Sequence, residues 1–179
     1  MSPLASAANQ ILSILTITAQ ILIVGLFAII LFKKSKLLDF IQKYAILFSF
    51  IVALIAVSGS LFYSEVAGFT PCKLCWFQRI FMYPQVILLG LALLKKDRNI
   101  ADYILALSIP GAIIAFYHYL LQLGIVPELS CQVVGYSVSC AQRFVMNFGY
   151  ITIPMMAISA FILIILLQLI KRGYNKNTV

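Results

Sequence analysis

Five long apolar runs constrain the fold of this chain more than any other feature of its sequence. They cover residues 11–32, 44–62, 76–94, 103–123 and 148–170, and each is close to the roughly 20 residues that a helix needs to cross a bilayer. The 179 residues are 63% hydrophobic and only 10% charged, which leaves no room for a separate soluble domain. The sequence therefore predicts an all-α, polytopic membrane helix bundle with five spans, forming one domain over residues 1–179.

Positive charge gathers in alternate connections between these runs. Ten of the 13 lysines and arginines lie in segments 33–43, 95–98 and 171–176. Because cytoplasmic loops of membrane proteins are rich in lysine and arginine, this pattern predicts an N-terminus outside the cell and a C-terminus in the cytoplasm. The first run has no charged residue before it and is longer than a signal-peptide core, so we expect it to be a retained span. The net charge of +8 thus indicates topology and an anionic lipid surface rather than nucleic-acid binding.

All four cysteines fall in the two connections that this topology places outside. Cys72 and Cys75 stand just before the third run, and Cys131 and Cys140 lie in the long connection before the fifth run. An even number of cysteines on the oxidising side of a membrane favours disulfides over free thiols. The second pair indicates either a loop on which a soluble thiol partner docks or a clip that restrains a long connection.

Cys72 and Cys75 form a C-x-x-C motif at the expected start of the third helix. The amides and dipole of a helix N-terminus stabilise a thiolate, and Lys73 and Arg79 add positive charge nearby. A stabilised thiolate is also a better leaving group in disulfide exchange. The pattern favours a redox-active pair, and it leaves two alternatives open, an inert structural disulfide and a zinc site.

Three polar side chains are expected within the outer leaflet. Arg79 lies about one turn beyond Cys75, where a charged group is costly and marks either a functional site or a side chain that snorkels to the headgroups. His118, the single histidine, is followed by Gln122 on the same helix face. His118, with Gln122 beside it, either donates a hydrogen bond to a lipid-soluble ligand or belongs with Tyr117 and Tyr119 to an interfacial aromatic belt. Because the sequence has no haem motif or nucleotide-binding loop, a membrane quinone is the expected electron acceptor.

These features make the chain resemble the bacterial disulfide bond formation protein B family (DsbB), and more closely its short-looped BdbC branch. The resemblance rests on "PCKLCWFQR", "HYLLQLGIVPELSC", the second cysteine pair and "FGYITIPMMAISAF", and it extends over about residues 44–170. It implies a four-helix disulfide-oxidase core over residues 44–170. Residues 11–32 would then be an extra N-terminal span.

The resemblance implies a thiol–disulfide oxidoreductase of the bacterial inner membrane. Such an enzyme reoxidises a DsbA-like thioredoxin-fold partner and passes the electrons through two cysteine pairs to ubiquinone or menaquinone. By this resemblance, Cys75 would engage the quinone and Cys72 would be its disulfide partner. Cys131 would be attacked by the soluble partner, and Cys140 would complete the second disulfide.

By the same resemblance, Arg79 and His118 match family positions near the quinone.

The main alternative function is a non-catalytic membrane protein with structural disulfides or an outer-face zinc site. An exporter of cytosolic reducing power would need cysteines within the spans, and this chain has none there. A protein resembling vitamin K epoxide reductase fits less well, because Gln-Arg after the C-x-x-C motif is typical of the DsbB family.

Overall fold

The computed structural model describes residues 3–32, 35–97, 99–127 and 139–177, and these form a bundle of long helices. The elements are α1 (Pro3–Phe32), α2 (Ser35–Leu61), the π-helical turn η1 (Phe62–Val66), α3 (Lys73–Lys95), α4 (Ala101–Gln122) and α5 (Ile153–Asn177). All five α-helices are long and apolar enough to cross a membrane. The prediction of an all-α membrane bundle with five spans is therefore confirmed.

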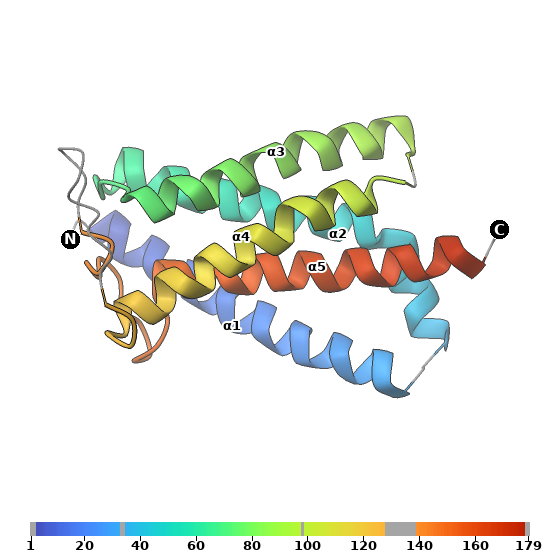
Figure 1. The fold of residues 1–179 in the computed structure, drawn as a ribbon, viewed down its shortest axis with the longest axis horizontal. Coiled ribbons are helices and arrows are strands. Elements are labelled where there is room, and N and C mark those ends of the chain that lie inside the picture. The colour runs from blue at the N-terminus through green and yellow to red at the C-terminus, as the bar shows by residue number, and fades with distance from the viewer. Residues whose placement is uncertain (1–2, 33–34, 98, 128–138, 178–179) are drawn as a thin grey trace.

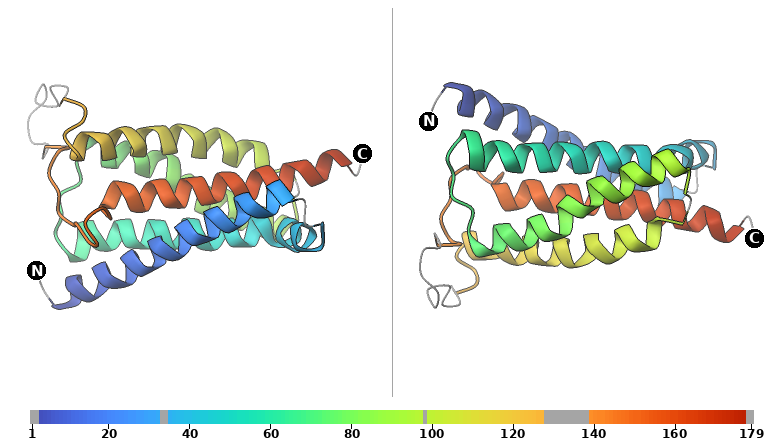
Figure 2. Two further views of the ribbon diagram at one scale, coloured as in Figure 1. Left: turned by 90° about the horizontal axis from the view of Figure 1, so that it is seen from below. Right: turned by 90° about the horizontal axis from the view of Figure 1, so that it is seen from above.

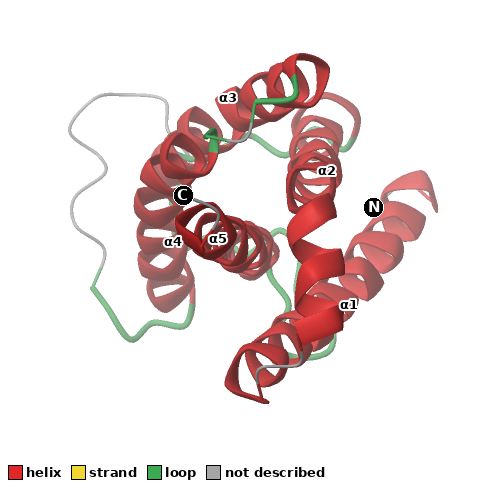
Figure 3. Ribbon diagram, turned by 90° about the vertical axis from the view of Figure 1, so that its right-hand side faces the viewer, coloured by secondary structure: helices red, strands yellow, loops and turns green. Residues whose placement is uncertain are grey.

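Helix α5 occupies the middle of the bundle (Figures 1 and 3). It packs against α1, α2 and α4, whereas α3 packs mainly on α2 and α4. Figure 2 shows the same arrangement from two opposite sides, with α1 running obliquely across the others. The first helix is therefore a packed member of the bundle and contacts α5 along one side.

The described cysteines, Cys72, Cys75 and Cys140, lie at one end of this bundle, and Lys95 and Lys171 lie at the other. The start of α1, the connection between α2 and α3, and the connection between α4 and α5 share one end (Figure 1). The connection between α3 and α4 and the end of α5 share the other end. Cys72, Cys75 and Cys140 are consequently a full helix length away from Lys95 and Lys171.

Close packing between α4 and α5 organises the core. Phe161, Leu89 and Ile104 are fully buried in one large apolar cluster. A Cβ atom at Gly111 would lie 2.4 Å from Cζ of Phe161, so only glycine permits this approach of α4 to the ring. A polar contact links two of the helices inside the bundle: the Gln168 amide nitrogen donates to the Ser49 hydroxyl over 2.8 Å, as is common between membrane helices.

Three helices begin well away from the first residue of the predicted runs, and one of them is α2, which begins at Ser35 rather than at residue 44. Helix α1 begins at Pro3 rather than at residue 11, because proline favours the first helical position and the polar residues that follow are compatible with a helix. Helix α5 begins at Ile153 rather than at residue 148. Phe148 and Gly149 have φ angles of 51° and 78°, and this left-handed turn cannot belong to an α-helix.

Candidate active site

The first cysteine pair lies at the N-terminus of α3. Cys72 is the N-cap residue, with φ −75° and ψ 173°, and its carbonyl accepts the Trp76 amide over 3.1 Å. Cys75 follows in the first helical turn. The two Sγ atoms are 3.1 Å apart, a hydrogen-bond distance from which a small movement reaches the roughly 2.05 Å of a disulfide. The local fold therefore brings the motif into the geometry of a reversible dithiol.

The two thiols have different environments. Cys72 is buried, whereas Cys75 is partly exposed to the space inside the bundle. The hydrogen bond with Cys75 and burial raise the pKa of Cys72 to about 12. In the dithiol form, Cys72 is therefore the protonated partner that donates to the sulfur of Cys75.

His118 connects α4 to both the first cysteine pair and the loop that contains Cys140. The Gln78 amide nitrogen lies 2.9 Å from Nδ1 of His118, and because an amide nitrogen donates, Nδ1 is the acceptor. Nε2 must then be protonated, and it donates to the Cys140 carbonyl over 3.0 Å. The same Nε2 is 3.7 Å from Sγ of Cys72. The imidazole is therefore held in one tautomer between the two cysteine-bearing segments.

Cys140 packs directly on the first pair. It forms a buried cluster with Cys72 and Leu121, against which Cys75 also packs. Gln122 also contacts the connection that contains Cys140: its Nε2 donates to the Gln142 carbonyl over 3.1 Å. One member of the second pair is thus held next to the first pair, whereas its predicted partner Cys131 lies outside the described residues.

Arg79 is one turn further along α3 and is held by α2. Its Nε donates to the Ser60 hydroxyl over 3.0 Å, and one Nη donates to the Ser60 carbonyl over 2.9 Å. The guanidinium carbon also lies 5.2 Å from the centre of the Trp76 ring, within cation–π distance. Among the described residues no carboxylate forms an ion pair with Arg79. The positive charge is therefore fixed in place, and it is available to a ligand with a partial negative charge.

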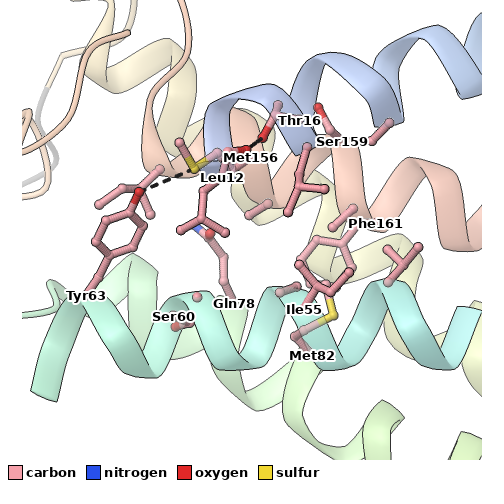
Figure 4. A pocket seen from close by; sticks show the side chains of 18 of the residues that line it. Leu12, Thr16, Ile55, Ser60, Tyr63, Gln78, Met82, Met156, Ser159 and Phe161 are labelled. Carbon is pink, nitrogen blue, oxygen red and sulfur yellow. Dashed lines mark hydrogen bonds between the residues drawn. The ribbon is translucent and has the colours of Figure 1, made fainter. Parts of the chain in front are cut away.

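An apolar cavity of about 290 Å³ lies next to this arginine. It is bounded by α1, α2, α3 and α5, and its lining includes Cys75, Gln78, Arg79, Ser60 and Tyr63. Figure 4 shows side chains from all four helices converging on this space. A mostly apolar hollow with a few polar groups at one end is typical of a site for a small lipophilic molecule.

Aromatic rings close the end of the cavity nearest the cysteine loops. The Tyr63 and Phe69 rings stack with centroids 5.7 Å apart, and Phe69 stacks in turn on Phe144 at 4.9 Å. The Tyr63 hydroxyl contacts the Met156 sulfur at 3.9 Å, as the dashed line in Figure 4 marks. All three rings line the cavity, and Phe69 and Phe144 belong to the connections before α3 and α5.

The structure places the predicted site residues in two neighbouring groups. Cys75 and Arg79 line the cavity, whereas His118 and Gln122 are absent from its lining and contact the Cys140 loop instead. Gln78 belongs to both groups, because it lines the cavity and also donates to His118.

Sequence analysis did not single out Gln78 or Ser60 as site residues. Two signals could have found them. Gln78 continues the three-residue spacing that begins with Cys72 and Cys75, so it shares their side of the helix. Ser60 is a polar residue near the end of an apolar span, where hydroxyl groups commonly pair across helices.

The cysteine junction also contains a group of atoms that a metal ion could use. The ligand atoms of Cys72, Cys75 and His118 lie within 4.8 Å of one another. Sulfur and imidazole ligands suit zinc, which in structural sites normally takes four of them. Both nitrogens of His118 are engaged by protein groups, so a metal would have to displace one of these hydrogen bonds.

Comparison with known proteins assigns the family. The model of the family "Disulfide bond formation protein DsbB" matches residues 42–170. The chain belongs to the DsbB family. It is 45% identical over 130 residues to disulfide bond formation protein C of Bacillus subtilis (strain 168), covering 70% of this chain and 90% of that protein.

Other relatives give the same result. The SPbeta prophage-derived disulfide bond formation protein B of Bacillus subtilis (strain 168) is 47% identical over 115 residues, which cover 64% of this chain and 76% of that protein. A probable disulfide formation protein of Metapseudomonas resinovorans is 39% identical over 127 residues, covering 71% and 88%. No solved structure matches the chain significantly. Family membership implies a multi-pass membrane protein with thiol oxidoreductase activity in disulfide bond formation.

Proposed function

We propose that this DsbB-family protein transfers electrons from an extracytoplasmic, DsbA-like thioredoxin-fold protein to a membrane quinone. The observation that supports this most strongly is the position of Cys75. It packs against the cluster of Cys72 and Cys140, and it also lines the apolar cavity beside Arg79. A sulfur in that position can exchange with another cysteine pair and can also reach a lipid-soluble oxidant.

The electron balance follows from two disulfide exchanges. Two thiols of the soluble partner become a disulfide as the Cys131–Cys140 disulfide becomes two thiols. These thiols then reduce the Cys72–Cys75 disulfide, and we assign the exchange to Cys140 because it packs beside Cys72. The resulting Cys72–Cys75 dithiol has two electrons and two protons to release.

A quinone fits the cavity by size and chemistry. The cavity volume of about 290 Å³ lies just below the roughly 300–1,000 Å³ of typical small-molecule sites. This size suits a quinone headgroup whose isoprenoid tail lies outside the cavity. The lining is mostly apolar, and its polar groups include Gln78 and Arg79 near Cys75, and Thr16 and Ser159 on the side of α1 and α5. When bound, a quinone supplies an acceptor for two electrons and two protons. We propose that Arg79, with Cys75 beside it, holds the polar end of that molecule.

The remaining residues act on the thiols. Cys72 keeps its proton and donates to Cys75, so the sulfur nearer the cavity is the more electron-rich of the two. His118, in its Nε2-protonated form, anchors the Cys140 carbonyl and positions the second pair for exchange. Gln122 supports the same loop. Arg79 stabilises negative charge in a medium where water competes poorly.

The orientation of the bundle follows from its charges. The end with Lys95 and Lys171 is basic, so we assign it to the cytoplasm. The cysteine end then faces outside, where an oxidised partner operates. We further propose that residues 44–170 form the disulfide-oxidase core and that residues 11–32 belong to an additional span.

Quinone reduction by the purified, full-length protein tests the proposal. The protein, in nanodiscs, is mixed with a reduced thioredoxin-fold partner and a quinone, and loss of quinone absorbance is followed. We expect turnover with the natural sequence, and a complete loss with Cys75→Ser. If the natural sequence reduced no quinone and contained stoichiometric zinc, the zinc-site alternative at Cys72, Cys75 and His118 would replace this proposal.

A further inference from the structure

Helix α1 forms one wall of the cavity beside Cys75, although it lies outside the family match over residues 42–170. Leu12, Leu15, Thr16, Ala19 and Leu22 of α1 line this cavity. Their spacing of three and four residues places them on one face of the helix. Without α1, the cavity between α2, α3 and α5 would be open on that side.

Polar contacts fix α1 in register against α5 and the loop before it. The Asn147 amide donates to the Ser13 hydroxyl over 2.7 Å, and the Tyr150 hydroxyl donates to Gln20 over 2.9 Å. Gln20 also donates to Ser159 of α5 over 3.3 Å. Hydrogen bonds between helices in a bilayer are directional and specify one arrangement. These hydrogen bonds therefore hold α1 in one position against α5.

A second hollow lies between α1 and α2, and its lining overlaps that of the first. Leu12, Ile55 and Gly59 line both. The residues that line only the second hollow include Ile11 and Leu54, which are 58% and 43% exposed. In a protein that spans a bilayer, such exposed apolar side chains face lipid. The second hollow therefore leads from the cavity toward the membrane.

Leu12 of α1 and Gly59 of α2 lie in contact where the linings of the two hollows overlap. A Cβ atom at Gly59 would lie 3.1 Å from a methyl carbon of Leu12, so the glycine lets the leucine side chain lie directly on α2. The side chains at this border are those of Leu12 and Ile55, and Leu12 can change rotamer without movement of either backbone. Figure 4 shows Leu12 at the centre of the cavity lining, between α1 and α2.

We propose that α1 completes the quinone site and that the isoprenoid tail leaves the cavity between α1 and α2, past Leu12 and Gly59. This inference rests on the proposed quinone-dependent function. The headgroup would occupy the end near Cys75 and Arg79, and the α1 face would replace the lipid that would otherwise border it. Specificity for the length and saturation of the tail would then depend on a helix that the family match does not include.

Kinetics with two quinones in the full-length protein test this path. Leu12→Trp places a larger side chain at the border that the two hollows share and should obstruct the path of the tail. We expect it to raise KM at least roughly tenfold for a quinone with a long isoprenoid tail, and less than about twofold for a tail-free benzoquinone. The matched control is Ile14→Trp, because Ile14 is on the same helix, is 58% exposed and lines neither hollow. It should match the natural protein with both quinones.

A second measurement does not depend on turnover or on a variant. A quinone analogue with a diazirine on its tail is photolysed with the natural protein in nanodiscs, and labelled peptides are mapped. We expect labels on residues 8–22 of α1 and 54–61 of α2. Labels confined to α3 and α4, or equal KM changes for both quinones, would overturn the proposed path. If the natural protein reduced neither quinone, the proposed function itself would fail, and this result is separate from a failure of the α1 path alone.

Discussion

Replacing Arg79 by alanine removes the only charged side chain among the described residues that line the cavity. The guanidinium is held by two hydrogen bonds to Ser60, at 3.0 and 2.9 Å, and has further N–H groups for a ligand. Because Ser60 belongs to α2 and Arg79 to α3, the charge is positioned by packing between two helices. The variant should leave that packing largely intact.

The magnitude follows from the bond that would be lost. A hydrogen bond to a charged group contributes about 1.5–3 kcal/mol, which corresponds to a change of roughly 10- to 150-fold. We therefore expect Arg79→Ala to raise KM for the quinone by about that factor. Arg79→Lys should recover only part of it, since a compact ammonium cannot make both bonds to Ser60 in the same geometry. Ser60→Ala removes the hydroxyl that accepts from Arg79 Nε and leaves the carbonyl acceptor in place, so it should raise KM less than Arg79→Ala does.

The assay is steady-state quinone reduction by purified protein in nanodiscs, with a saturating reduced partner. Arg172→Ala is the matched control, because Arg172 is at the opposite end of the bundle, where it pairs with Asp102 over 3.1 Å. It should not change KM. Quantifying the mixed disulfide with the partner shows whether thiol exchange is preserved. An unchanged quinone KM in Arg79→Ala, with normal exchange, would mean that Arg79 only anchors α3 and that the polar end of the quinone site lies elsewhere.

Three further predictions concern the thiols and the core. With a pKa of about 12, Cys72 in the dithiol form has a thiolate fraction of only about 10⁻⁴ at pH 8, so we expect iodoacetamide to alkylate it on the order of 10³-fold more slowly than an ordinary thiol with a pKa near 8.5. The alkylation rate should rise about tenfold per pH unit up to pH 10, and a rate independent of pH would contradict the assignment. Cys140→Ser should trap the mixed disulfide between the partner and Cys131 on a non-reducing gel, and absence of that species would contradict the order of exchange. Gly111→Ala should lower the free energy of unfolding by about 1–3 kcal/mol, because its Cβ would meet the Phe161 ring. The control Gly25→Ala has no atom within 4 Å of the new Cβ and should be neutral in the same denaturation assay, and equal stabilities would refute the packing argument.

Much of this architecture could be predicted from hydropathy and charge. Transfer to lipid is unfavourable for exposed backbone and for charge, so each long uncharged run had to be a helix. The spacing of Cys72 and Cys75 before such a run placed both at a helix N-terminus, and the structure has them there. Arg79 lies one turn beyond them and lines the cavity with Cys75, because three- and four-residue spacings share a helix face.

Hydropathy could not predict features that depend on backbone shape or on helix packing. The segment before α5 is apolar, so nothing in its composition separates the left-handed turn at Phe148 and Gly149 from the helix that follows. The contact of Gly111 with Phe161 and that of Gly59 with Leu12 are long-range. For the same reason the first span could be recognised as extra, but its contribution to the cavity could not be anticipated.

The C-x-x-C motif stands at the start of α3, between the cluster that contains Cys140 and the apolar cavity. Cys72 ends the extended connection and is buried with Cys140 and Leu121, whereas Cys75, one turn along, faces the cavity. In the proposed function, disulfide exchange takes place on the Cys140 side of the pair, and a lipophilic oxidant needs the apolar cavity on the other side. The start of α3 lies between these two sides. The sulfurs of Cys72 and Cys75 are 3.1 Å apart there, so the pair itself connects the two sides. Gln78, one turn further along α3, lines the cavity and donates to His118, which in turn donates to the Cys140 carbonyl. The first two turns of α3 therefore connect the cavity to the Cys140 loop.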